Sequence, residues 1–183
     1  MNKKIILGGG CFWITEAIFR RVTGIINVFS GYAGGDAITP SYEAVSTGRT
    51  GHTECVYIEY SNTQTDLKTI LDIFFDTIDP TLIDRQGPDI GTQYRSAIYY
   101  YDDEDLSFIR KSIMEHQRKY KDPIVTEVAK LAVKGFYIAD NFHQDYYSKN
   151  KNAVYCNAII KPLINKIEKT YGQRKSTLLG GSL

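Results

Sequence analysis

Three consecutive glycines at positions 8–10 separate a short apolar run at 5–7 from a segment at 14–22 with helical character. The pattern predicts a strand over residues 3–8, a tight turn, and a helix over residues 12–22. Cys11 then lies in the first turn of that helix, where unpaired backbone N–H groups and the helix dipole favour the thiolate over the thiol. The sequence therefore predicts a nucleophilic cysteine at a strand-to-helix junction.

The alternative for Cys11 is a small buried apolar residue without chemistry, which is the commoner state of a free cysteine beside aromatic residues. The neighbouring glycines favour a functional role. We expect them to keep side chains away from the sulfur and to let backbone amides face a bound molecule.

Composition limits the class of protein. A chain of 183 residues, 43% of them hydrophobic, can bury one core, so we expect a single domain over residues 1–183. Its 22 basic and 21 acidic residues nearly balance, so we expect no nucleic-acid partner. The first apolar run is too short for a secretory signal and no run reaches transmembrane length, so we expect a cytoplasmic protein with no membrane partner.

The remaining patterns predict further strands and helices. These are a strand at 25–32, a loop at 34–40, a strand at 52–60, a helix at 66–78, a strand at 95–101, a helix at 103–120 and a strand at 125–133. The order strand, helix, strand, strand, helix, strand is typical of an α+β fold, a two-layer split βαβ (ferredoxin-like) sandwich. A C-terminal extension over about 140–183 follows, and it includes an apparent helix that ends at Tyr171.

The alternating strand at 52–60 carries a second site candidate. Glu54 shares a face with Val56 and Ile58, whereas Cys55 points to the other face. Desolvation beside apolar neighbours would keep Glu54 protonated and suited to give a proton to an oxygen. The alternative is an exposed surface carboxylate. We expect Cys55 to be buried and unreactive.

A polar, turn-rich loop at 85–96 contains Asp89 and Tyr94 and leads into the fourth predicted strand. Loops of this kind often carry functional residues. The local sequence fits a plain aspartate-containing turn equally well.

Six motifs together resemble the peptide methionine sulfoxide reductase A family. In chain order they are residues 8–13 (GGGCFW), 31–35 (GYAGG), 41–45 (SYEAV), 48–54 (GRTGHTE), 91–99 (GTQYRSAIY) and 142–147 (FHQDYY). The resemblance spans about residues 5–156. It implies a thiol-dependent oxidoreductase that reduces methionine-S-sulfoxide, protein-bound or free, to methionine. It implies no cofactor, and the widely spaced cysteines offer no metal site.

The resemblance also implies roles for the cysteines. Cys11 would match the residue that attacks the sulfoxide sulfur, and Phe12 and Trp13 would match the aromatic walls around the S-methyl group. Cys156 would match the recycling cysteine, which forms a disulfide with Cys11 that a thioredoxin-like partner reduces. Some relatives carry another cysteine at the position of Ile14, so Cys156 is the predicted resolver here. If the segment after Cys156 is rigid, local opening has to precede that step.

The resemblance further implies an acid and its helpers. Glu54 would match the group that protonates or hydrogen-bonds the sulfoxide oxygen, with Tyr42 and Tyr94 as its hydroxyl partners. Asp89 would match the carboxylate that helps to hold the site and the substrate backbone. Pro88 stands where the family often has asparagine. We expect the protein to act as a monomer.

Two other functions fit parts of the sequence. A papain-like cysteine peptidase would pair Cys11 with His143, which lies downstream at the spacing of that class, but the flanking residues do not match. A non-catalytic module could use Phe12, Trp13, Tyr42 and Tyr94 to bind an apolar side chain of a partner. Outside the peptidase alternative, the sequence assigns no role to His52, His116 or His143.

Overall fold

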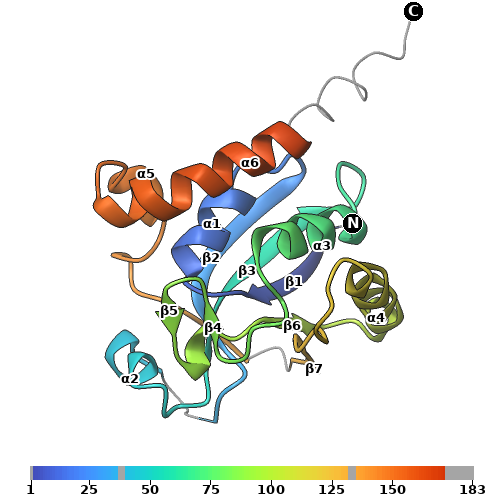
Figure 1. The fold of residues 1–183 in the computed structure, drawn as a ribbon, viewed down its shortest axis with the longest axis horizontal. Coiled ribbons are helices and arrows are strands. Elements are labelled where there is room, and N and C mark those ends of the chain that lie inside the picture. The colour runs from blue at the N-terminus through green and yellow to red at the C-terminus, as the bar shows by residue number, and fades with distance from the viewer. Residues whose placement is uncertain (1, 37–39, 132–134, 172–183) are drawn as a thin grey trace, which may run out of the picture.

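The computed structural model describes residues 2–36, 40–131 and 135–171 as a curled sheet with helices packed against it (Figure 1). The strands of the main sheet lie in the order β7-β6-β1-β3-β2-β8, and all of them pair antiparallel except β6 and β7. Their bounds are β1 Asn2–Gly8, β2 Ile25–Ala33, β3 Thr53–Ser61, β6 Ala97–Tyr100, β7 Glu127–Lys130 and β8 Phe136–Ile138.

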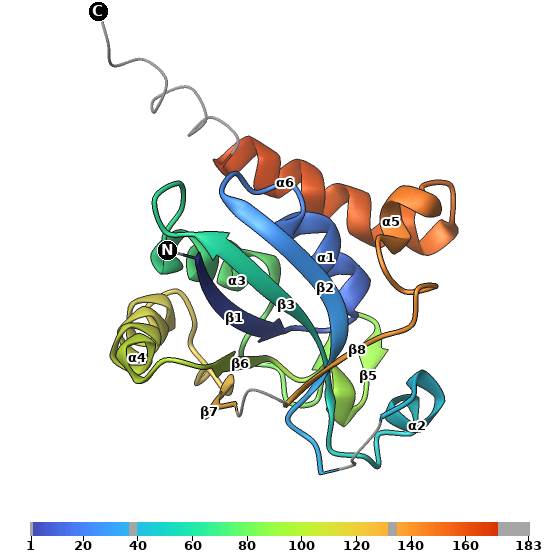
Figure 2. The ribbon, with the colours of Figure 1, turned by 180° about the vertical axis from the view of Figure 1, so that it is seen from behind.

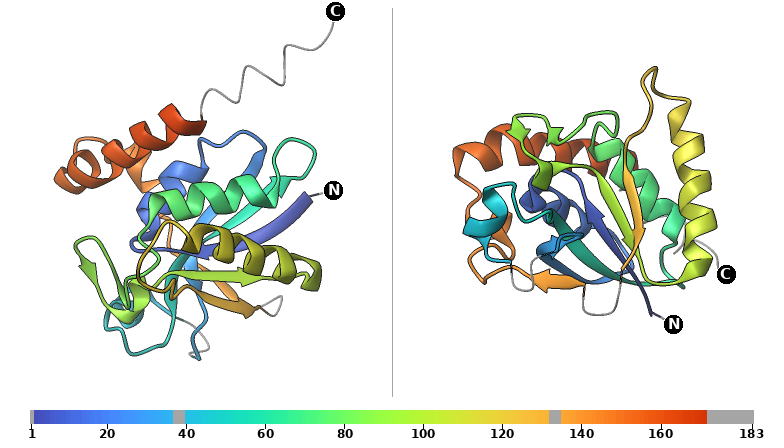
Figure 3. Two further views of the ribbon diagram at one scale, coloured as in Figure 1. Left: turned by 45° about the vertical axis from the view of Figure 1, so that its right-hand side comes forward. Right: turned by 90° about the horizontal axis from the view of Figure 1, so that it is seen from below.

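The helices are α1 Phe12–Phe19, α2 Tyr42–Ser46, α3 Leu67–Thr77, α4 Asp103–Gln117, α5 Tyr146–Lys149 and α6 Lys161–Tyr171. Of these, α1 and α3 cover one face of the sheet (Figure 2), and α6 packs on both of them. Figure 2 shows the strands toward the viewer with α1 and α3 behind them, and Figure 3 shows α3 and α4 side by side. A two-stranded hairpin, β4 Arg85–Gln86 and β5 Asp89–Ile90, a 3-10 helix at Thr92–Tyr94 and a π-helical turn at Cys156–Ile160 complete the described structure. No helix within the described ranges is long and apolar enough to cross a membrane.

The predicted strands and helices of the core are confirmed, with shifted ends. The first helix ends at Phe19 instead of residue 22, because the chain turns there toward Gly24, whose φ is +86°. The fourth strand starts at Ala97, because residues 92–94 form a 3-10 helix. The short elements α2, β4, β5, β8 and α5 were not predicted. Residues 37–39 of the expected loop, 132–133 of the expected strand and 172–183 of the extension lie outside the described residues.

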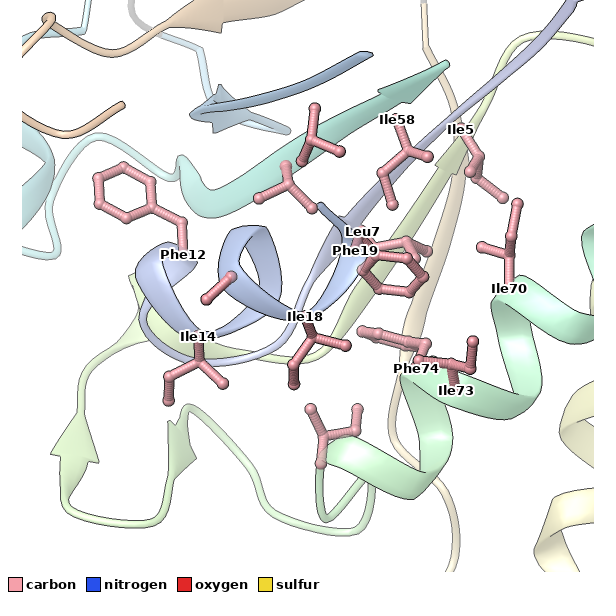
Figure 4. Close-up of a cluster of buried hydrophobic side chains, with 14 of the residues drawn as sticks. Ile5, Leu7, Phe12, Ile14, Ile18, Phe19, Ile58, Ile70, Ile73 and Phe74 are labelled. Atoms are coloured by element: carbon pink, nitrogen blue, oxygen red, sulfur yellow. The ribbon is translucent and has the colours of Figure 1, made fainter. Parts of the chain in front are cut away.

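Alternation along the strands divides the buried side chains between the two faces of the sheet. On the helical face, Ile5, Leu7 and Ile58 meet apolar side chains of α1 and α3, as Figure 4 shows. On the other face, Ile6 and Cys55 belong to a smaller cluster. The burial predicted for Cys55 is confirmed, since it is 1% exposed and its thiol donates to the Gly31 carbonyl oxygen at 3.6 Å.

Capping and apolar spacing explain the placement of α3. The Asp66 side chain accepts a hydrogen bond from the Thr69 N–H at 2.7 Å, which satisfies one of the free donors at the helix start. The apolar positions recur every three or four residues and face the sheet: Leu67, Ile70, Leu71, Phe74 and Phe75.

The far end of α6 is anchored on α3. The Asp76 backbone oxygen accepts a hydrogen bond from Lys166 Nζ at 2.6 Å, and its carboxylate accepts one from the Tyr171 hydroxyl at 2.5 Å. The near end of α6 follows the π-helical turn, and Pro162 in its first turn has no N–H to give to the carbonyl of residue 158. The two ends of α6 are therefore held differently, the far end by hydrogen bonds and the near end by the packing of Cys156 and Ile160 in the core.

Replacement of a core aromatic should cost far more stability than replacement of an exposed one. Phe74 is fully buried between α3 and the sheet, so Phe74→Ala should lower the free energy of unfolding by about 3–5 kcal/mol. The matched control is Phe108→Ala on α4, where the side chain is 40% exposed and the loss should stay below about 1 kcal/mol. Urea unfolding of the three proteins measures both values, and equal losses would contradict this description of the core.

Candidate active site

The junction between β1 and α1 places Cys11 as predicted, at the position that caps α1, with φ −59° and ψ 125°. Gly10 before it has φ +82°, a conformation that L residues rarely adopt, and a Cβ there would lie 2.7 Å from the Gln86 Cβ. The Gly10 N–H donates to the Tyr94 carbonyl oxygen at 3.2 Å. This bond ties the cysteine turn to the 3-10 helix that carries Tyr94.

The other two glycines have a different role from the one predicted. A Cβ on Gly8 would lie 2.6 Å from Thr53 Cγ2, and a Cβ on Gly9 would lie 2.7 Å from Ile78 Cγ2. Both positions face packed side chains instead of the approach to the sulfur. The expectation that they clear that approach is therefore wrong for Gly8 and Gly9, whose lack of a side chain lets the junction pack against β3 and the end of α3.

A cavity of about 220 Å³ gathers most of the predicted residues. It is lined by Cys11, Phe12, Trp13, Tyr42, Glu54, Asp89, Tyr94 and Tyr155. The lining thus brings together α1, α2, β3, β5, the 3-10 helix and the residue before the π-helical turn. Of the predicted site residues, only Cys156 is missing from it.

Glu54 is buried at the inner end of this cavity and is only 2% exposed. Its Oε2 accepts a hydrogen bond from the Phe12 N–H at 3.2 Å. Burial raises the pKa of the carboxyl from 4.5 to about 8, opposed by the Phe12 hydrogen bond and assisted by the negative charge of Asp89. Glu54 therefore keeps its proton at neutral pH, as the strand pattern predicted, and the surface-carboxylate alternative is wrong.

The expectation of a stabilised thiolate at Cys11 is wrong. Burial raises the pKa of this thiol well above its ordinary value, and Glu54, once it is ionised, and Asp89 raise it further. A backbone hydrogen bond at Trp13 and a contact with the Tyr155 hydroxyl lower it, but by less. A helix terminus is worth at most about 2 kcal/mol, and desolvation of a fully buried charge exceeds that. Cys11 is therefore a neutral thiol beside a neutral carboxyl.

Hydroxyl donors surround this pair. Burial raises the pKa of Tyr42 and of Tyr94, so both phenols keep their protons. Tyr42 begins α2, and the 3-10 helix that carries Tyr94 is bonded to that helix. Thr92 Oγ1 donates to the Gly48 carbonyl oxygen at 2.9 Å, and Gln93 Nε2 donates to that of Ser46 at 3.3 Å. These contacts fix the two tyrosines relative to each other.

Tyr155 is a site residue that the sequence reasoning missed. Its hydroxyl donates to Asp89 Oδ2 at 2.8 Å and also contacts the Cys11 thiol. Burial raises the pKa of Asp89, and the hydrogen bond from Tyr155 opposes the shift. The signal in the sequence was the position of Tyr155 directly before Cys156, a cysteine already singled out.

The structure does not bring Cys156 to Cys11. Cys156 is fully buried in the π-helical turn and packs in the main core, while the preceding Tyr155 points into the cavity. Both cysteines are free thiols. A disulfide between them requires this turn to open.

The histidines do not supply a base for the thiol. All three histidines are described and none lines the cavity. His143 lies behind its aromatic wall, with its ring 4.3 Å from that of Tyr42 and 5.8 Å from that of Trp13, and burial lowers its pKa. Among the described residues no group of three or more His, Cys, Asp or Glu could hold a metal ion. The geometry therefore lacks the cysteine–histidine pair of a peptidase.

Comparisons with known proteins agree on one family. A family model described as peptide methionine sulfoxide reductase matches residues 3–176. The peptide methionine sulfoxide reductase MsrA of Clostridium tetani is 51% identical over 154 residues, which cover 84% of this chain and 92% of that protein. The solved structure of Mxr1 from Saccharomyces cerevisiae in reduced form matches with a TM-score of 0.79 at 36% identity, covering 85% of this chain and 89% of Mxr1. Mxr1 in complex with Trx2 matches with a TM-score of 0.57 at 26% identity, covering 79% and 84%.

The raised pKa of Glu54 predicts how stability changes with pH. Between pH 4.5 and about 8 the unfolded chain ionises this carboxyl while the folded chain keeps its proton, so the free energy of unfolding falls as pH rises through this window. Glu54→Gln cannot ionise and should gain stability relative to wild type from pH 5 to pH 8, then level off. Urea unfolding at a series of pH values measures the difference.

The matched control is Glu59→Gln on the same strand. Asn27 and Asn2 donate hydrogen bonds to Glu59 and lower its pKa, so this variant should show no gain over the same range. A constant difference between Glu54→Gln and wild type would rule out a buried, protonated Glu54.

Proposed function

The chain belongs to the peptide methionine sulfoxide reductase family, and from this premise we propose which of its residues carry the reaction. Its activity is the reduction of methionine sulfoxide to methionine. One observation carries the assignment of roles. A buried, protonated Glu54 and a buried Cys11 thiol line the same cavity, which Phe12 and Trp13 wall with aromatic rings.

In the proposed binding mode, the S-methyl group lies against Phe12 and Trp13, and the sulfoxide oxygen faces Glu54. Tyr42 and Tyr94 line the same cavity as Glu54 and present phenols that remain donors. Asp89 lies toward the substrate backbone, where the hydrogen bond from Tyr155 orients its carboxylate. We propose the S epimer of the sulfoxide, protein-bound or free, as substrate.

In the proposed chemical step, Glu54 gives its proton to the sulfoxide oxygen while the Cys11 sulfur attacks the sulfoxide sulfur. The thiol proton of Cys11 passes to the Glu54 carboxylate. The hydroxyl then passes from the substrate sulfur to the Cys11 sulfur, as the substrate S–O bond and the S–S bond formed in the attack both break. The products are methionine and a sulfenic acid on Cys11, and the thiol has lost two electrons to the sulfoxide. Ionised Glu54 raises the pKa of Cys11, so the thiol keeps its proton more tightly once the carboxyl has lost its own.

Turnover then requires reduction of the sulfenic acid. Cys156 attacks the Cys11 sulfur, water leaves, and a Cys11–Cys156 disulfide forms. A thioredoxin-type dithiol reduces the disulfide to two thiols. The solved complex of the yeast relative Mxr1 with Trx2 supports this partner. Because Cys156 is buried in the π-helical turn, opening of that turn precedes the attack.

We propose further that the chain is one domain, residues 1–183, which acts as a monomer. Residues of a single chain complete the cavity, which supports this assignment. The strand order β6-β1-β3-β2 with α1 and α3 on one face supports a ferredoxin-like core. The three free thiols fit a reducing compartment such as the cytoplasm. Neither a peptidase nor a non-catalytic module accounts for a protonated carboxyl beside the thiol.

Separate assays of the two sulfoxide epimers test the assignment. Wild type should reduce only the S epimer of a blocked methionine sulfoxide, with dithiothreitol or with thioredoxin as reductant. Cys11→Ser should abolish both reactions, because the attacking sulfur is lost. Cys156→Ser should keep the dithiothreitol reaction and lose the thioredoxin reaction.

The control for these thiols is Cys55→Ser, which changes a buried cysteine on the other face of the sheet and should leave both reactions near wild type. Wild type that reduces neither epimer would refute the function. A Cys156→Ser variant that still turns over with thioredoxin would refute only the recycling role.

The pH dependence tests Glu54 as the acid. Because its pKa is about 8, kcat/KM of the dithiothreitol reaction should fall above that pH as Glu54 loses its proton. Glu54→Gln should lower kcat/KM by about 100-fold or more and remove the falling limb. Tyr42→Phe should lower the rate but keep the limb, since the acid remains. A limb that persists in Glu54→Gln would assign it to another group.

A further inference from the structure

A buried carboxylate on α1 has no part in the chemistry above. Glu16 is 1% exposed and does not line the cavity. Both of its oxygens accept the Asp145 N–H, at 2.9 Å each, and Oε1 also accepts a hydrogen bond from Arg20 Nε at 3.2 Å. A carboxylate buried at this depth needs hydrogen-bond partners, and Asp145 and Arg20 supply them.

The partner of Glu16 is Asp145, the residue directly before α5. Asp145 has φ +51° and ψ +40°, and Tyr146 follows it as the first residue of the helix. The segment before it is fixed to β2 through Gln144, which donates to the Ser30 carbonyl oxygen at 2.8 Å and accepts the Ser30 N–H at 3.0 Å. Glu16 is therefore a second attachment point, and it acts on the backbone directly before Tyr146.

Tyr146 in turn supports a wall of the cavity. Its ring stacks on Trp13 with centroids 3.6 Å apart and planes 6° from parallel. The Trp13 Nε1 is buried and has no hydrogen-bond partner in the described part of the chain. Packing alone orients this indole. Trp13 and Glu16 lie three positions apart on α1 and so project from the same side of the helix.

We propose that Glu16 is a positioning residue that fixes Trp13 through Asp145 and Tyr146, and that it thereby limits the size of the S-alkyl group that the cavity accepts. The inference rests on the proposed function, since it concerns the pocket for the methyl group of the sulfoxide. Without the carboxylate, the Asp145 N–H loses its buried acceptor, and Arg20 keeps only its 3.8 Å ion pair with Asp145 and a hydrogen bond to the Val28 carbonyl oxygen. The start of α5 can then move, the stack loosens, and Trp13 yields to a larger group.

The test compares the S epimers of N-acetyl methionine sulfoxide and N-acetyl ethionine sulfoxide, which differ by one methylene, with dithiothreitol as reductant. Wild type should prefer the methyl compound in kcat/KM by about tenfold or more. Glu16→Ala should remove most of this preference. Its kcat/KM should fall for the methyl compound and should rise, or fall by less, for the ethyl compound. Glu16→Gln keeps an amide oxygen for the Asp145 N–H, and its preference should fall by less than about threefold.

Two further variants serve as a positive and a negative control for this result. Tyr146→Ala removes the stack directly and should lower the preference as Glu16→Ala does. Glu168→Gln makes the same chemical change as Glu16→Gln at an exposed carboxylate that also pairs with an arginine, Arg21 at 3.9 Å. It should leave the preference unchanged.

Trp13 is the only tryptophan of the chain, so its fluorescence reports the wall independently of activity. Glu16→Ala and Tyr146→Ala should shift its emission to longer wavelength and make it more accessible to acrylamide. Glu168→Gln should leave the spectrum as in wild type.

An unchanged methyl preference in Glu16→Ala would overturn the proposal, even if overall activity fell. A merely structural role would lower kcat/KM for both substrates by the same factor. Unchanged Trp13 emission would overturn it as well. If Glu16→Ala does not fold, an unchanged preference in Tyr146→Ala is the overturning result. If wild type reduces neither compound, the proposed function fails, and the limit on S-alkyl size falls with it; the emission of Glu16→Ala then shows whether Glu16 still orients Trp13.

Discussion

The hydrogen bond from the Phe12 N–H to Glu54 joins the start of α1, where the proposed nucleophile Cys11 lies, to the proposed acid on β3. It also limits how far the pKa of Glu54 is raised. Burial alone would raise the pKa of Glu54 further, whereas the hydrogen bond from the N–H at the helix start lowers it. The result, about 8, leaves a carboxyl that holds its proton at neutral pH and can still release it. Gly8 serves this bond, because its lack of a side chain lets the end of β1 lie close to Thr53 and Glu54 on β3.

Local patterns in the sequence predicted the parts of the site that depend on one element. Alternation along β3 placed Glu54 inward and Cys55 outward, and the glycine run placed Cys11 at a helix start. Local rules failed where three-dimensional packing decides. The helix start suggested a stabilised thiolate at Cys11, but burial of the thiol among residues distant in the sequence outweighs it. Tyr155 and the support from Glu16 depend on contacts across more than a hundred residues, and no periodicity reports them.

The C-terminal segment is part of the site instead of an appendage to it. Tyr155 reaches Asp89 and Cys11, and Tyr146 holds Trp13 in place. The same segment carries Cys156, which would have to leave its buried position for the recycling step. Movement of this segment would therefore disturb the walls that bind the substrate. Binding of a sulfoxide and recycling of the thiol would then be unable to occur at the same time.

The different attachment of the two ends of α6 bears on how fast recycling can be. Its far end is bonded to Asp76, whereas its near end begins with the π-helical turn and Pro162. If only the near end unwinds, Cys156 stays on a short tether between α5 and the anchored helix. A tethered group meets its target at an effective concentration set by tether length, on the order of millimolar. The sulfenic acid on Cys11 would then react with its own chain sooner than with any small thiol present below that concentration.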